Sequence, residues 1–244
     1  MITPSQTISP QWYARVGGAA YLLIILTGGY DEMFIRSGMT VAGNPEATMN
    51  NIIASSLKWR IGIALDLVQH IGDVVLMMCL YMLLKPVNKN LALFAMLFTI
   101  IQTSVLIANK LNLFTPLFLS NDAAYLKAFD PKQLQALSYV SLRMHEHGFG
   151  VALIFFSFDC LVNGYLIFRS GYFPKLIGVL MQLAGICYLI NSFSMIVAPD
   201  FSGKLFPVIL LVPFVGELSL CLWLLLKGVN IKEWNKRSGI TENG

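Results

Sequence analysis

Charge is scarce in this sequence. Of its 244 residues, 12% are charged and 56% are hydrophobic. A soluble domain carries about 25% charged residues, so the composition argues against a soluble protein and predicts a polytopic membrane protein. The formal net charge of +4 is modest and gives no indication of a nucleic-acid partner. The partner that the composition predicts is the lipid bilayer.

Sequence motifs for catalysis are also missing. The four cysteines lie in apolar segments, where neither a disulfide nor a CxxC metal site is expected, at Cys79, Cys160, Cys187 and Cys221. The sequence contains no HExxH metal motif and no GxSxG nucleophile motif. A non-enzymatic protein is therefore favoured, and the sequence assigns no cofactor.

Long apolar runs dominate the chain instead. Six segments can cross a bilayer as helices: the first three at residues 16–35, 61–84 and 91–113, a fourth that ends at about residue 168, and the last two at 176–197 and 205–226. We therefore expect an all-α fold, a bundle of six transmembrane helices over residues 16–226. Residues 1–15 would form a cytoplasmic segment before it, and residues 227–244 a basic cytoplasmic tail. Pro207 and Pro213 are expected to bend the sixth helix.

Capping residues mark two further helix starts. Asn44 before Pro45 predicts a short surface helix between the first two spans. Asp130, Pro131 and Gln133 form a capping-box pattern. The helix that begins there could run unbroken into the fourth span and extend beyond the bilayer.

The distribution of basic residues predicts the orientation. The turns at 85–90 and 169–175 and the tail from residue 227 are short and rich in Lys and Arg, whereas the loops at 36–60 and 114–142 are longer and less densely basic. By the positive-inside rule, both termini are expected in the cytoplasm.

Polar side chains form one stripe on the second span. Asp66, Gln69, His70 and Asp73 are spaced i, i+3, i+4 and i+7, so they share one face of a helix. An ionisable group at membrane depth is costly, roughly 3 kcal/mol for one Asp on insertion scales. We therefore expect this face to point into the interior of the bundle.

Two other spans carry an acid at a similar depth. Asp73, Asp159 and Glu217 lie 12, 10 and 10 residues before the basic residues Lys85, Arg169 and Lys227 that end their helices. At ~1.5 Å per residue, the three carboxyls are about 15–18 Å from the cytoplasmic face, close to the middle of a ~30 Å hydrocarbon core. The pattern suggests three weakly repeated helical hairpins.

These groups admit a functional and a structural interpretation. In the first, Asp66, Gln69, His70, Asp73 and His145 line a polar cavity that opens outward, and Asp159 and Glu217 close its floor. Such a cavity could bind a small polar or cationic solute, or relay protons through His70. In the second, the same groups form interhelical hydrogen bonds and ion pairs that fix helix register, as in a structural or assembly subunit.

A metal-dependent intramembrane enzyme is a further alternative. Asp66 and His70 have i, i+4 spacing, and His145 could complete a ligand set. Haem held by His70 and either His145 or His147 is less favoured, because nothing else in the sequence supports redox chemistry. Near the fourth span, Arg143 and Glu146 are expected to form a surface ion pair. Lys110 is expected to extend its ammonium to the membrane surface.

Four segments carry a family resemblance. They are ARVGGAAYLLIILTG (14–28), LYMLLKPVNKNLAL (80–93), YLIFRSGYFPKLIGVL (165–180) and ELSLCLWLLLKG (217–228). In combination they resemble the bacterial six-span membrane family catalogued as domain of unknown function 4386, over roughly residues 13–228. The resemblance implies the six-span fold and a bacterial cytoplasmic membrane location. It implies no reaction and no ligand residues.

Overall fold

Six long helices form the molecule. The computed structural model describes residues 9–239, and every regular element within them is helical. The spanning helices are α1 (Pro10–Tyr30), α4 (Ser56–Leu84), α5 (Lys89–Asn109), α7 (Pro131–Ser170), α8 (Lys175–Val197) and α10 (Leu211–Leu226). With their short helical extensions, these six segments are long and apolar enough to cross a membrane. The predicted all-α six-helix bundle is confirmed.

Shorter helical elements connect the spans. They are η1 (Asp31–Arg36), α2 (Ser37–Met39), α3 (Pro45–Ala54), η2 (Lys110–Phe114), α6 (Thr115–Leu119), η3 (Ala124–Ala128), α9 (Pro199–Leu205), η4 (Val208–Leu210) and α11 (Ile231–Arg237). Of these, η1 is a π-helical turn that joins α1 to α2 without a break.

Both predicted helix starts are confirmed. Asn44 caps α3 by accepting a hydrogen bond from the amide of Ala47 (3.0 Å). Asp130 and Gln133 form the two reciprocal hydrogen bonds of a capping box at the start of α7 (2.9 and 3.0 Å). The 40-residue α7 then runs unbroken through the fourth apolar segment.

The first helix is longer than expected. It begins at Pro10, because Ser9 caps it and Pro10 occupies the first turn. It continues through η1 to Met39. Residues 10–15 are therefore the first residues of α1. Of the expected terminal segments, residues 1–8 and 240–244 lie outside the described part of the chain.

The sixth span also differs from expectation. Pro207 precedes η4, and Pro213 lies in the first turn of α10, where a missing amide costs no helical hydrogen bond. The two prolines therefore lie at the start of this span.

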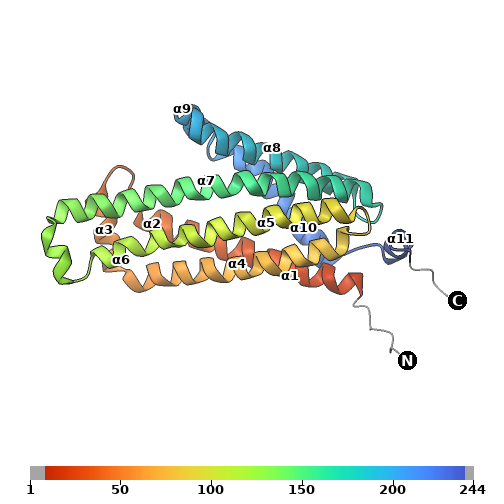
Figure 1. The fold of residues 1–244 in the computed structure, drawn as a ribbon, viewed down its shortest axis with the longest axis horizontal. Coiled ribbons are helices and arrows are strands. Elements are labelled where there is room, and N and C mark those ends of the chain that lie inside the picture. The colour runs from red at the N-terminus through yellow and green to blue at the C-terminus, as the bar shows by residue number, and fades with distance from the viewer. Residues whose placement is uncertain (1–8, 240–244) are drawn as a thin grey trace, which may run out of the picture.

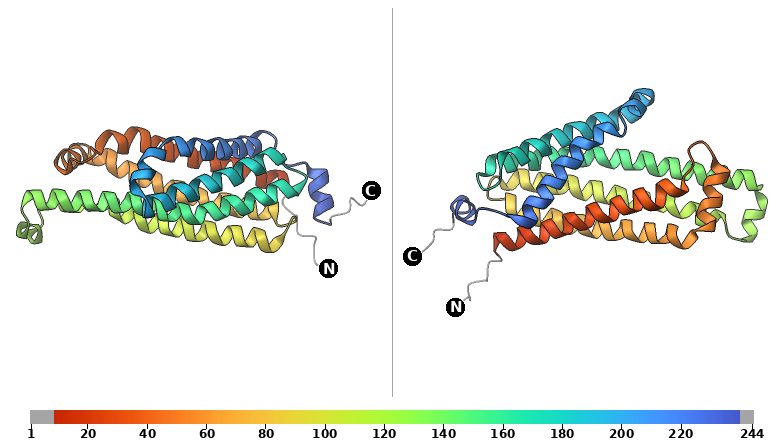
Figure 2. Two further views of the ribbon diagram at one scale, coloured as in Figure 1. Left: turned by 90° about the horizontal axis from the view of Figure 1, so that it is seen from above. Right: turned by 180° about the vertical axis from the view of Figure 1, so that it is seen from behind.

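Consecutive spans pack as neighbours. Helices α1, α4, α5 and α7 run side by side, while α8 and α9 lean away from them at one end (Figure 1). Two further views show α10 between α8 and α1 (Figure 2). Both described chain ends lie at the same end of the bundle, which we call the terminal end (Figure 1). The opposite end, which includes α3 and α6, is called the distal end.

An apolar core fills the terminal half of the bundle. Its most buried members come from α4, α7 and α10, at Leu83, Leu84, Leu166, Ile167, Leu220 and Leu224. The turn between α7 and α8 closes this core, since the Tyr172 hydroxyl donates a hydrogen bond to the carbonyl of Leu83 (2.7 Å). Burial raises the pKa of the Tyr172 phenol. The polar side chains of the stripe lie on the distal side of this core.

Candidate functional site: a three-carboxyl pocket

The polar stripe of α4 divides between two sites. Asp66 contacts charged groups near the distal end, whereas Gln69 and Asp73 line a pocket. His70 is buried between these positions and is 2% exposed. The stripe faces the bundle interior, yet its members do not share one cavity.

Near the distal end, four charged side chains form what we call the ion-pair cluster: Asp31, Arg36, Asp66 and Lys110. Arg36 pairs with Asp31 (Nε to Oδ2, 2.5 Å) and with Asp66. Lys110 also pairs with Asp66 (Nζ to Oδ2, 3.0 Å). Two cationic and two acidic groups balance one another, so this burial leaves no net charge.

This cluster corrects the expectation for Lys110. Its side chain is 6% exposed and pairs with Asp66, so it does not extend to the membrane surface. His145 is also held there, because Arg36 Nη1 lies 3.3 Å from His145 Nε2. The Arg143–Glu146 pair, by contrast, is on the surface as expected, with side chains about half exposed.

The three residues considered as metal ligands, Asp66, His70 and His145, each contact another side chain of the protein. Asp66 and His145 are engaged by Arg36, and His70 is engaged by Asp73. Within residues 9–239, no three His, Cys, Asp or Glu side chains converge as metal ligands would.

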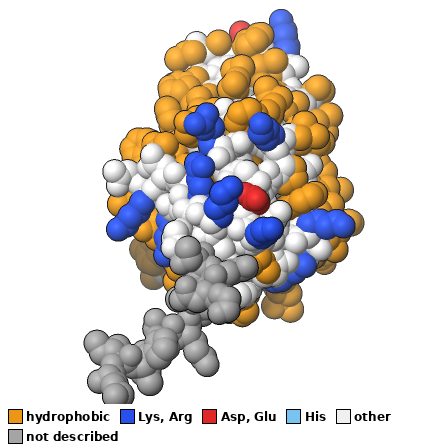
Figure 3. All heavy atoms as spheres, turned by 90° about the vertical axis from the view of Figure 1, so that its right-hand side faces the viewer, with side chains coloured by type: hydrophobic (Ala, Val, Ile, Leu, Met, Phe, Trp, Pro, Cys, Tyr) orange, Lys and Arg blue, Asp and Glu red, His pale blue; other side chains and the backbone are white. Residues whose placement is uncertain are grey.

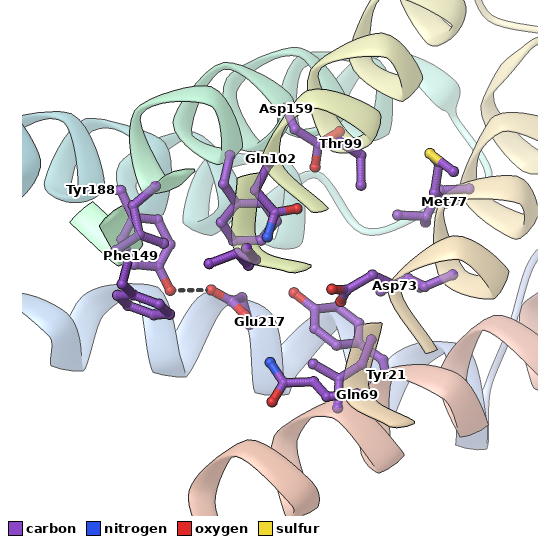
Figure 4. A pocket seen from close by; sticks show the side chains of 16 residues that line it. Tyr21, Gln69, Asp73, Met77, Thr99, Gln102, Phe149, Asp159, Tyr188 and Glu217 are labelled. Carbon is purple, nitrogen blue, oxygen red and sulfur yellow. Dashed lines mark hydrogen bonds between the residues drawn. The ribbon is translucent and has the colours of Figure 1, made fainter. Parts of the chain in front are cut away.

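A pocket of about 140 Å³ lies next to this cluster, towards the terminal end. Every spanning helix contributes to its lining (Figure 4). Its polar lining residues are Tyr21, Gln69, Asp73, Thr99, Gln102, Asp159, Tyr188 and Glu217. Its apolar lining includes the phenyl rings of Phe149 and Phe156. We call this cavity the carboxyl pocket.

Three acids line the carboxyl pocket from three different helices. Asp73 comes from α4, Asp159 from α7 and Glu217 from α10. Similar spacings of 12, 10 and 10 residues from the basic residues that end these helices indicated a similar depth, and the structure places all three acids in one lining. No Lys, Arg or His is among the described residues that form this lining.

Each carboxyl has hydrogen-bonding neighbours, and Thr99 and Tyr21 are among those of Asp159 and Glu217 respectively. Asp73 Oδ2 lies 2.9 Å from His70 Nδ1. Asp159 Oδ1 accepts from Asn163 Nδ2 (2.7 Å), and Glu217 accepts from the Tyr188 hydroxyl. Figure 4 shows the Tyr188–Glu217 bond at the edge of the pocket.

His70 supports the pocket from behind. It is absent from the lining, and its Nδ1 is directed at Asp73. Its Nε2 is buried without a hydrogen-bond partner in the described part of the chain. Contact with one carboxyl gives His70 a positioning role, and the expected relay between two carboxyls stays a prediction.

Several residues at these sites gave little signal in the sequence. Arg36 was missed because it follows Asp31 by five residues, a spacing that pairs side chains only within a π-helical turn. Tyr21 and Tyr188 were missed because an aromatic residue in an apolar helix is usually core or membrane belt. The buried hydroxyls, which need partners, were the available signal.

Comparison with known proteins assigns a family. Residues 16–228 match the family model described as a domain of unknown function (DUF4386). An uncharacterized protein of Archaeoglobus fulgidus is 28% identical over 162 residues, which cover 66% of this chain and 80% of that protein. No solved structure matches. The family match covers most of the chain and all six spanning helices, so this multi-pass membrane protein belongs to the DUF4386 family.

Proposed function

We propose that this protein binds a cation in the carboxyl pocket. One observation carries the proposal: Asp73, Asp159 and Glu217 line a single pocket whose described lining contains no cationic side chain. Three carboxylates at close quarters repel one another, and their burial in a membrane is costly. A bound cation would offset both costs.

The ion-pair cluster supports this argument by contrast. There the same chain neutralises its buried acids internally, Asp31 with Arg36 and Asp66 with Arg36 and Lys110. If the pocket acids served only to fix helix register, similar pairing with basic side chains would be expected. Asp73 has the imidazole of His70 as its partner, whereas the partners of Asp159 and Glu217 are all uncharged: Asn163, Thr99, Tyr188 and Tyr21.

Binding to the detergent-purified protein tests this function. Isothermal titration would use K⁺, Na⁺ and tetramethylammonium, with N-methylglucamine as the background cation. We expect saturable binding of at least one of the three. Asp159→Asn should weaken it at least about tenfold, because removal of one partner from a buried charge pair costs roughly 2–5 kcal/mol.

Asp122→Asn is the matched control, since Asp122 lies on an exposed connection far from the pocket lining. It should bind as the wild type does. If no cation binds, or if Asp159→Asn binds with unchanged affinity, the proposal fails and a structural role is favoured.

A further inference from the structure

We infer that the bound cation is a small free organic ammonium that also carries a hydrogen-bond acceptor oxygen. This inference rests on the proposed cation binding and specifies its chemical class. Four features of the carboxyl pocket support it: volume, aromatic lining, separation of the carboxyls and one buried amide.

The volume suits a molecule better than a bare ion. A cavity of about 150 Å³ can hold benzene, so the pocket of about 140 Å³ has room for roughly six or seven non-hydrogen atoms. A single alkali ion would leave most of that space to be filled by water. The lining is only partly polar, with Leu76, Leu80, Leu106 and Leu153 among its members.

The aromatic lining favours an organic cation. Tyr21, Phe149, Phe156 and Tyr188 each contribute to the pocket wall. Aromatic faces attract cations, and cages of such rings recognise quaternary ammonium groups. The positive charge of an alkylated ammonium is spread over its methyl groups. Such an ion can therefore contact aromatic rings and carboxylates at the same time.

The positions of the carboxyls agree with a diffuse charge. They come from separate helices, and no three acidic, His or Cys groups of residues 9–239 converge on one point as metal ligands do. A molecular cation can contact carboxyls on several walls without such convergence.

Gln102 indicates a second feature of the ligand. Gln102 is only 6% exposed, and it lines the pocket. Its Oε1 accepts a hydrogen bond from the Thr103 hydroxyl (3.2 Å), while its Nε2 has no acceptor among the residues that the structure describes. Figure 4 shows this amide directed into the pocket. A ligand oxygen in the pocket would give this amide donor a hydrogen-bond partner.

A free ammonium fits better than the headgroup of a phospholipid. The described lining contains no Lys, Arg or His that could bind a phosphate group. Three carboxylates would repel that phosphate group. Choline is a suitable probe, since it combines a quaternary ammonium with a hydroxyl oxygen and has seven non-hydrogen atoms.

Titration of the purified full chain with choline, tetramethylammonium, phosphocholine and K⁺ tests the inference. We expect choline to bind at least about tenfold more tightly than K⁺ and several-fold more tightly than tetramethylammonium. Phosphocholine should bind at least tenfold more weakly than choline.

Two variants separate the contributions. Gln102→Leu should reduce choline affinity to that of tetramethylammonium while tetramethylammonium affinity stays unchanged, which also shows that the variant folds. Phe156→Leu should lower the binding affinity for both choline and tetramethylammonium several-fold. Phe158→Leu is its control, since Phe158 stacks on Phe98 and is absent from the lining.

The outcomes distinguish the two proposals. Tighter binding of K⁺ or Na⁺ than of either ammonium would overturn this inference and leave cation binding standing. Equal binding of phosphocholine and choline would overturn the assignment to a free ammonium. An unchanged preference for choline in Gln102→Leu would overturn the acceptor-oxygen assignment. Binding of no cation would overturn both proposals.

Discussion

Asp66 and Asp73 lie about two turns apart on one face of α4, and their neighbours differ completely. Asp66 meets Arg36 and Lys110, so its charge is balanced within the protein. Asp73 contacts His70 and lines the carboxyl pocket. Identical side chains on one helix therefore have different surroundings, and for Asp66 the basic residues of η1 and η2 decide them.

Arg36 should be the residue on which the ion-pair cluster depends. Arg36→Met would leave Asp31 without its cationic partner and Asp66 with Lys110 alone. We expect a loss of about 3–5 kcal/mol of unfolding free energy, because an uncompensated charge stays buried. Denaturant or thermal unfolding in detergent would measure it.

Arg143→Met is the control for Arg36→Met. Arg143 also pairs with an acid, Glu146, but both side chains are about half exposed. Loss of such a surface pair should cost at most about 1 kcal/mol. Equal effects of the two substitutions would contradict the structural role given to the cluster.

At the scale of the elements, the α7–α8 crossing determines where two pocket residues meet. Asp159 comes from α7 and Tyr188 from α8. The helices approach each other closely at Gly164 and Gly178. A Cβ atom on Gly178 would lie 2.6 Å from the carbonyl oxygen of Gly164 and 2.6 Å from the amide of Phe168. Both are backbone atoms, which cannot turn aside as a side chain can.

Gly178→Ala should therefore push α8 away from α7. We expect a destabilisation of roughly 1–3 kcal/mol, as overpacking usually costs, together with weaker cation binding. Gly38→Ala is the control, because nothing lies within 4 Å of the corresponding Cβ position. Thermal unfolding and the cation titration would be measured on both variants, and equal behaviour would contradict the proposed close contact.

The whole molecule has one strongly basic end. Figure 3 views the terminal end, where Lys and Arg side chains gather. The helix ends and turns there supply Arg15, Lys85, Lys89, Arg169, Lys175, Lys227, Lys232, Lys236 and Arg237. Short basic segments are retained on the cytoplasmic side of a membrane, so we expect this end to be cytoplasmic.

Reporter fusions would test that orientation in bacterial cells. Green fluorescent protein fused after residue 244 should fluoresce, because the expected location is the cytoplasm. Alkaline phosphatase fused at the same position should stay inactive. The reverse pattern would show that the terminal end faces outward, and fusions placed within the connection near Asp122 should give the opposite result to the C-terminal ones.

The sequence by itself determined the elements of this protein. Apolar length fixed the six spans, because backbone groups in lipid must satisfy their hydrogen bonds within a helix. Capping residues fixed the starts of α3 and α7. Even the common depth of Asp73, Asp159 and Glu217 followed from residue counts, since a helix rises by a constant amount per residue.

Only the tertiary structure decided which polar groups meet. The pairing of Arg36 with Asp31 depends on the π-helical turn, and the pairing of Lys110 with Asp66 depends on how η2, which continues α5, lies against α4. Gly62 also matters, because a Cβ atom there would clash with Asp31 Oδ1. A sequence pattern gives the face of one helix, whereas partners on other helices depend on rotation and close packing between them. For that reason Asp66 was expected in the cavity and lies instead in an ion-pair cluster.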